Sequence, residues 1–112
     1  MPKGKILEAI RFFEDCLKET GLNISKIILF GSQAAGKATA ESDIDVAILS
    51  EDFRDKDIFE RAALTKDAEI RTIKKFIIPL DIITMTPEEF ESETSLAAIY
   101  AKEGEVVYKT RK

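Results

Sequence analysis

The sequence contains no histidine, no tryptophan and only one cysteine. Without histidine the chain cannot build a Ser-His-Asp or Cys-His catalytic site, and zinc sites with histidine ligands are excluded as well. A single thiol also cannot close an intrachain disulfide. Because Cys16 falls within an apolar helical pattern, we interpret it as a small buried side chain, with a reactive thiol as the alternative.

Long apolar runs are also missing. None approaches the roughly 20 residues that span a membrane, and the first residues show no signal-peptide pattern. Lys and Arg total 17 and Asp and Glu total 21, so the net charge is −4. This acidic balance disfavours a nucleic-acid partner, because phosphate binding needs basic residues, but it permits a nucleotide held through metal ions. Together these features predict a cytoplasmic protein with no membrane contact.

The chain has 112 residues, of which 45% are hydrophobic, which suits one compact domain. We therefore predict a single domain over residues 1–112. Buried strands are predicted at 27–30, 43–49 and 77–83, and Pro79 favours an edge position or a strand start for the last of them. Predicted helices cover about residues 6–17, 33–38, 55–75, 87 onward and 95–102. This alternation predicts an α/β sandwich, with a small mixed β-sheet packed against helices.

Three aspartates are candidate metal ligands. Asp43 and Asp45 lie two apart on a predicted strand, so their carboxylates share one face and repel each other unless a cation lies between them. Magnesium suits such a pair, since it binds one or two carboxylates together with phosphate oxygens. Asp81 lies in an apolar run, where an unpaired carboxylate is costly to bury, and it can join them from a neighbouring strand. The alternatives are a solvated strand start for the pair and an ion pair at a strand edge for Asp81.

Gly31 and Ser32 follow the first predicted strand directly. A glycine at this point lets the backbone approach a ligand closely. The N-terminus of the short helix that follows offers free N–H groups to an anion, and Ser32 adds a hydroxyl. The alternative is that Ser32 only caps that helix.

Read together, these motifs resemble the signature of the DNA polymerase beta-like nucleotidyltransferase superfamily. They are Gly31-Ser32, Gly36 and Ser42-Asp43-Ile44-Asp45, with Asp81 as the later carboxylate on another strand. The small size is similar to that of the minimal nucleotidyltransferases that act as antitoxins of helical HEPN ribonuclease toxins. The resemblance implies a nucleotidyltransferase-like fold, and it implies that Asp43, Asp45 and Asp81 hold two Mg²⁺ ions and catalyse transfer of a nucleoside monophosphate.

The resemblance also implies a triphosphate site. Gly31-Ser32 would bind the outer phosphates, with Ser42 and Lys37 as further nucleotide-binding residues. Relatives often carry basic residues where this chain has Gln33 and Ala35. Their absence weakens the expected grip on the triphosphate, and Lys37 is the nearest substitute in the sequence.

In the antitoxin-like relatives the acceptor is a tyrosine of the toxin. The resemblance therefore implies ATP as donor and a HEPN-type protein as partner. One alternative is a binding module that covers a toxin without catalysis, for which Leu96, Ile99 and Tyr100 would provide an apolar surface unless they pack on the sheet. A second is a small-molecule nucleotidyltransferase with a pocket built by a homodimer. Retention of three mutually repelling carboxylates favours an enzyme over the binding module.

Overall fold

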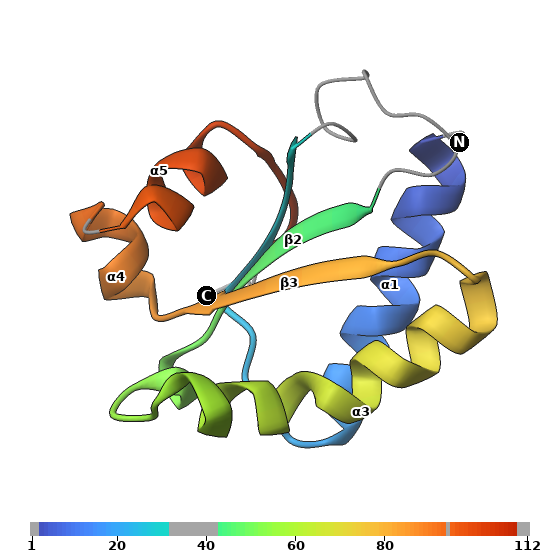
Figure 1. The fold of residues 1–112 in the computed structure, drawn as a ribbon, viewed down its shortest axis with the longest axis horizontal. Coiled ribbons are helices and arrows are strands. Elements are labelled where there is room, and N and C mark those ends of the chain that lie inside the picture. The colour runs from blue at the N-terminus through green and yellow to red at the C-terminus, as the bar shows by residue number, and fades with distance from the viewer. Residues whose placement is uncertain (1–2, 32–42, 94, 110–112) are drawn as a thin grey trace.

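The computed structural model describes residues 3–31, 43–93 and 95–109. Four strands form one mixed sheet in the order β3-β2-β1-β4 (Figure 1). β1 (Lys26–Phe30) is antiparallel to both β2 (Ile44–Leu49) and β4 (Glu105–Lys109), whereas β2 and β3 (Leu80–Met85) are parallel. The predicted α/β fold, with a small mixed sheet packed against helices, is confirmed.

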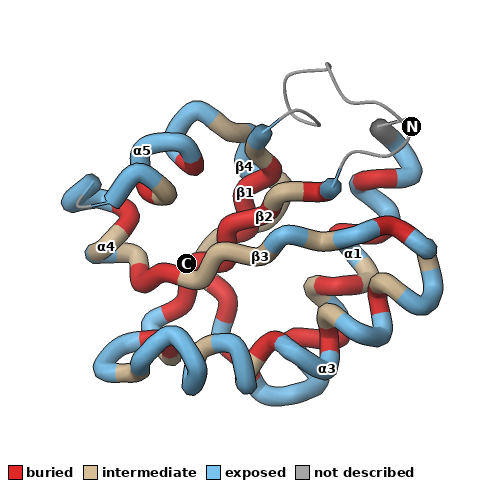
Figure 2. Tube along the Cα trace, in the orientation of Figure 1, coloured by how far each residue is buried: buried red, intermediate tan, exposed pale blue. Residues whose placement is uncertain are grey.

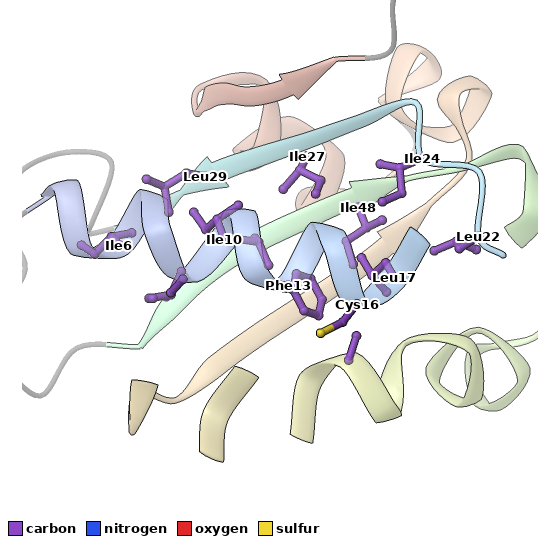
Figure 3. Close-up of a cluster of buried hydrophobic side chains, with 14 of the residues drawn as sticks. Ile6, Ile10, Phe13, Cys16, Leu17, Leu22, Ile24, Ile27, Leu29 and Ile48 are labelled. Carbon is purple, nitrogen blue, oxygen red and sulfur yellow. The ribbon is translucent and has the colours of Figure 1, made fainter. Parts of the chain in front are cut away.

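Two long helices cover one face of the sheet. α1 (Lys3–Glu19) and α3 (Ile58–Phe76) pack against each other there. In Figure 1, α1 descends from the N-terminus at the upper right and α3 runs along the lower side. The buried residues of α1 recur at helical spacing and meet side chains of β1 and β2 (Figure 3). Cys16 is among them and is 1% exposed, which confirms the structural interpretation, and burial raises the pKa of its thiol. This is the larger core cluster of the molecule.

Two short helices cover part of the opposite face. α4 (Pro87–Ser92) and α5 (Leu96–Lys102) enclose a second buried cluster with the sheet. Its members are Ile28, Ala47, Leu49, Met85, Phe90, Ala98 and Ala101. Thr86 caps α4 in a capping box with Glu89 as its partner, and proline occupies the first helical position. Figure 2 shows the buried residues concentrated in β1 and β2 and recurring at intervals along the helices.

Several predicted boundaries differ from the structure. α3 is one unbroken helix that begins at Ile58, after a 3-10 turn at Glu51–Phe53. β3 begins at Leu80, because Ile77 ends α3 in a left-handed conformation with φ of 54°. β3 is an edge strand, as Pro79 suggested. No strand was predicted after residue 83, but Glu105–Lys109 forms β4 at the other edge of the sheet.

The larger apolar residues of α5 do not pack on the sheet, so of the two alternatives for them the exposed surface is observed. Leu96, Ile99 and Tyr100 are 68%, 41% and 56% exposed, because Ala98 and Ala101 form the side of α5 that contacts the sheet. Small alanine side chains bring the helix close and leave its larger residues outside. Among the described residues, no helix is long and apolar enough to cross a membrane.

Candidate active site

The register of β2 and β3 brings two of the three candidate aspartates together. Asp45 pairs with Asp81 across the parallel ladder, and with Phe30 across the antiparallel one. Paired residues project to the same face of a sheet, so the two carboxylates are neighbours. Asp43 lies one residue before β2 and is exposed.

This acidic group occupies the end of the sheet at which β2 begins. Strand alternation puts Asp45 and Asp81 on the same face as Ala47, Leu49 and Met85, which lie farther along the strands beneath α4 and α5. The described helices therefore cover the apolar part of this face. The half-buried Asp45 and the exposed Asp81 lie nearer the N-terminal ends of their strands, outside the part of the sheet that α4 and α5 cover.

The carboxylates are electrostatically coupled. Burial raises the pKa of the Asp45 carboxyl, and the negative charges of Asp81 and Asp43 and a side-chain hydrogen bond with Asp81 raise it further. The Asp45 carboxyl therefore gives up its proton less readily than an ordinary aspartate does.

The reasoning that led to Asp81 needs a correction. We expected a burial cost at this position, but the side chain is exposed because β3 is an edge strand. No described Lys or Arg forms an ion pair with Asp81, so the alternative of an edge ion pair is not observed there. Its proximity to Asp45, and not the cost of burying it, makes it a candidate.

Gly31 lies against the same carboxylate. Its φ is +73°, and a Cβ built on it would overlap Oδ2 of Asp45 and lie 3.1 Å from Cγ. Both the backbone conformation and the space therefore restrict this position to glycine. Close approach of a ligand to this glycine stays a prediction; in the structure, the Gly31 backbone closes one side of Asp45.

Gly104 is a neighbouring residue that the sequence analysis did not single out as part of the site. A Cβ at Gly104 would lie 2.5 Å from the carbonyl oxygen of Leu29 and 2.8 Å from Cβ of Phe30. The turn between α5 and β4 thus packs tightly on the end of β1 that leads into Gly31. The only sequence feature that could have indicated this tight packing is a glycine placed between a predicted helix and the residues after it.

The donor set fits a divalent cation. Carboxylate oxygens are hard ligands of the type that Mg²⁺ prefers, and a cation would relieve the repulsion that raises the pKa of Asp45. Across the described ranges, no three acidic side chains converge closely enough to form a finished metal site. The Asp45–Asp81 pair is therefore the centre of the candidate site, with Asp43 beside it.

The remaining candidates lie outside the described residues. They are Ser32, Gln33, Ala35, Gly36, Lys37 and Ser42.

A sequence model of the nucleotidyltransferase domain matches residues 10–107. The chain belongs to the nucleotidyltransferase domain family. The matched region contains Gly31 and all three aspartates, so the geometry above is that of the region by which the family is recognised. No curated protein is similar enough in sequence to match this nucleotidyltransferase domain.

Solved structures share the fold. A candidate nucleotidyltransferase from Sulfolobus solfataricus has 21% sequence identity and a TM-score of 0.61, covering 100% of this chain and 93% of its own. A toxin–antitoxin structure with AMP-PNP has 19% identity and a TM-score of 0.59, covering 99% and 76%. A mutant of the toxin–antitoxin MntA-HpeT has 17% identity and a TM-score of 0.60, with the same coverage of 99% and 76%. At these identities the likeness concerns the fold alone.

Proposed function

We propose that this nucleotidyltransferase domain transfers a nucleoside monophosphate, AMP from ATP, to a hydroxyl group of a protein partner. The observation that carries the proposal is the contact of three elements at one end of the sheet. Asp45 and Asp81 are paired on β2 and β3, and Gly31 at the end of β1 leaves no room for a side chain beside them. Paired carboxylates beside a glycine turn suit a metal-bound triphosphate.

Two Mg²⁺ ions held by Asp43, Asp45 and Asp81 would neutralise the triphosphate and polarise the phosphate under attack. In this reaction the acceptor oxygen bonds to the α-phosphorus, and the bond from that phosphorus to the bridging oxygen breaks. Pyrophosphate leaves with that electron pair. Asp81 is the exposed carboxylate of the pair, so we assign it to receive the proton of the acceptor hydroxyl. Asp45, held between Asp81 and Gly31, would orient the metal-bound phosphates.

Gly31-Ser32 with Ser42 and Lys37 would complete the nucleotide site in this proposal. Gln33 and Ala35 replace the basic residues of many relatives, and the loss of two cations favours weak binding of the triphosphate. The domain would then depend on its metal ions for most of the charge neutralisation.

A HEPN-type partner is the acceptor that we propose. Two of the similar solved structures are of toxin–antitoxin systems, one of them with AMP-PNP. The exposed apolar side chains of α5 offer a surface for a protein: Leu96, Ile99 and Tyr100 are 68%, 41% and 56% exposed. The same exposure supports the competing function, in which the chain blocks a toxin by binding alone.

ATP labelled at either end distinguishes transfer from binding. The domain is incubated with Mg²⁺ and a HEPN-type protein, using ATP labelled at the α-phosphate in one sample and at the γ-phosphate in another. We expect the partner to gain the α-label only, and to gain none with the double variant Asp43→Asn/Asp45→Asn. Label from the γ-phosphate would indicate a kinase and contradict the proposal. Stable complex formation without any label would leave the binding module as the function.

A further inference from the structure

The outer edge of β3 is the feature that carries a further inference, and it does not rest on the proposed function. We propose that β3 pairs with β3 of a second copy of this chain. The two strands would run antiparallel about Ile82 and join two four-stranded sheets into one. The observations that support this concern the backbone of the edge, the register that it allows and the groove beside it.

The backbone ladder fixes which groups of β3 point outward. The N–H of Ile44 donates to the carbonyl of Pro79 at 2.9 Å, and the N–H of Ser50 donates to the carbonyl of Met85 at 3.0 Å. In a parallel ladder, alternate residues of a strand direct both backbone groups to the same neighbour. The odd-numbered residues of β3 therefore face β2. Outward-facing N–H and C=O groups belong to Leu80, Ile82 and Thr84.

Asp81 is the one charged residue within β3, and two other usual protections of a free edge, proline and a bulge, are missing from this strand. Pro79 does not block it, because its carbonyl points to β2 and its missing N–H lies on that same side. Within β3 there is no proline or lysine, and its pairing with β2 has no bulge. An edge with an intact row of donors and acceptors is a template for pairing with another strand.

One antiparallel register uses the whole row. Centred on Ile82, it pairs that residue with its own copy and Leu80 with Thr84, so each outward-facing residue meets another one. Asp81 then lies opposite Ile83. The register centred on Asp81 would place two aspartates directly opposite each other, which is destabilising. The register centred on Ile83 would leave Leu80 without a partner.

The groove beside this edge suits the β3 strand of the second copy. A groove of about 370 Å³ lies between α3 and β3. Its apolar wall includes Ile58, Ala62 and Ile82, and its charged lining residues are Lys56, Arg61 and Glu69. Ile58 is 73% exposed although it faces this strand. Paired residues share a face, so Ile82 of the second copy would lie on the α3 side of the joined sheet and cover Ile58. An occupant must offer a free strand with an apolar residue on this face, and β3 itself does so.

Both acidic sites would open on the same face of the joined sheet, opposite to α3. They would lie beside each other and would not face one another across the interface. This differs from a homodimer whose acidic groups line one shared pocket, as the small-molecule alternative requires.

Sedimentation velocity over a range of concentrations tests the association. We expect the full chain to form a dimer whose dissociation constant rises at least about tenfold with Ile58→Lys, which places a charge in the groove, and with Thr84→Pro. Thr84→Pro removes an outward N–H and no bond to β2, so the sheet is retained. Leu96→Lys, at an equally exposed apolar residue on α5, is the matched control and should not change the dimer. A chain that remains monomeric, or a dimer disrupted only by Leu96→Lys, would overturn the proposal.

Amide hydrogen exchange tests the strand pairing itself. In the dimer, the amides of Leu80, Ile82 and Thr84 should be protected, and in the Ile58→Lys variant they should exchange quickly. The amides of Asp81, Ile83 and Met85 bond to β2 and should stay protected in both. A dimer in which the three outward amides exchange as quickly as in the Ile58→Lys variant would show that β3 is not the interface.

Discussion

Asp45 and Asp81 are paired positions on adjacent parallel strands, and the charge of Asp81 helps to raise the pKa of the Asp45 carboxyl. In the metal-free fold the Asp45 carboxyl therefore keeps its proton to a higher pH than an ordinary aspartate does. Burial is the first cause of the raised pKa of Asp45, and the charges of Asp81 and Asp43 add to it. Ionisation of Asp45 therefore costs the metal-free folded protein some stability.

Asp45→Asn should stabilise the metal-free protein at neutral pH. A raised pKa means that the folded state binds the proton more tightly than the unfolded state does. The stabilisation from that proton is complete at low pH and is lost as the pH rises through the raised value. An asparagine amide can donate to Asp81 at every pH, so we expect a gain on the order of 1 kcal/mol, measured by thermal melts in EDTA.

The pH dependence of that gain provides its control. Near the ordinary pKa of an aspartate the wild type keeps its proton, so the advantage of Asp45→Asn should shrink as the pH falls. Asp43→Asn, at an exposed position before the strand, should change the melting temperature much less. An equal gain at all pH values would show that electrostatic repulsion is not the cause.

Gly31→Ala should both destabilise the fold and abolish nucleotide binding. The φ of +73° costs an L-residue about 1–2 kcal/mol, and the new Cβ would also overlap the Asp45 carboxylate. Gly21→Ala is the matched control, because its φ is +88° but nothing lies within 4 Å of a Cβ there. Denaturant unfolding of both variants separates backbone strain from the clash, and equal losses would contradict the close approach of Gly31 to Asp45.

Glu89→Gln should destabilise the junction of α3 and α4. Arg61 donates to both carboxylate oxygens of Glu89, at 2.8 and 3.2 Å, and these bonds are the main cause of its lowered pKa. A carboxyl whose pKa is lowered by folding stabilises the fold at pH values above its pKa in the unfolded state. This stabilisation is lost as the pH falls through its pKa in the folded state. Because Glu89 is partly exposed, we expect a loss of about 1 kcal/mol at neutral pH, declining in acid.

Glu88→Gln provides the comparison for that loss. The Glu88 side chain is 76% exposed and makes one contact with Arg54 at 3.3 Å, so its replacement should have little effect on the melting temperature. Equal losses from the two substitutions would indicate that the paired geometry at Glu89 contributes nothing.

Ile77→Asn should stabilise the chain. Ile77 ends α3 with φ of 54°, a conformation that disfavours a β-branched residue, and its side chain is 80% exposed, so little burial is lost. We expect a gain of about 1 kcal/mol in denaturant unfolding. Leu96→Asn, at an exposed residue in a helical conformation, should give no gain, and a similar gain there would mean that exposure alone explains the effect.

The sequence predicted those parts of the fold that depend on local pattern. Apolar spacing located α1, and a helix was correctly predicted from Pro87, because local patterns of this kind are contained in a few neighbouring residues. Pro79 likewise indicated an edge strand. Ile77 gave no such signal, because its left-handed conformation is imposed by the chain reversal between α3 and β3.

Properties set by tertiary contacts were predicted less well. The exposure of Asp81 follows from the strand order, which the sequence does not state. The exposure of Leu96 follows from the choice of Ala98 and Ala101 as the contact with the sheet, although all three residues are apolar. The pairing of Asp45 with Asp81 was expected only if the two strands were neighbours, and the parallel register makes them so.

Calorimetric titration of the domain with ATP, in Mg²⁺ and in EDTA, tests the central claim most directly. If Asp43, Asp45 and Asp81 form a metal-dependent nucleotide site, ATP binds in Mg²⁺, does not bind in EDTA, and does not bind the Asp43→Asn/Asp45→Asn variant in either. Parallel titrations with GTP, CTP and UTP identify the preferred base. ATP binding that persists in EDTA or in the double variant would contradict the site, and absence of binding to the wild type in Mg²⁺ would contradict nucleotide use by the isolated domain.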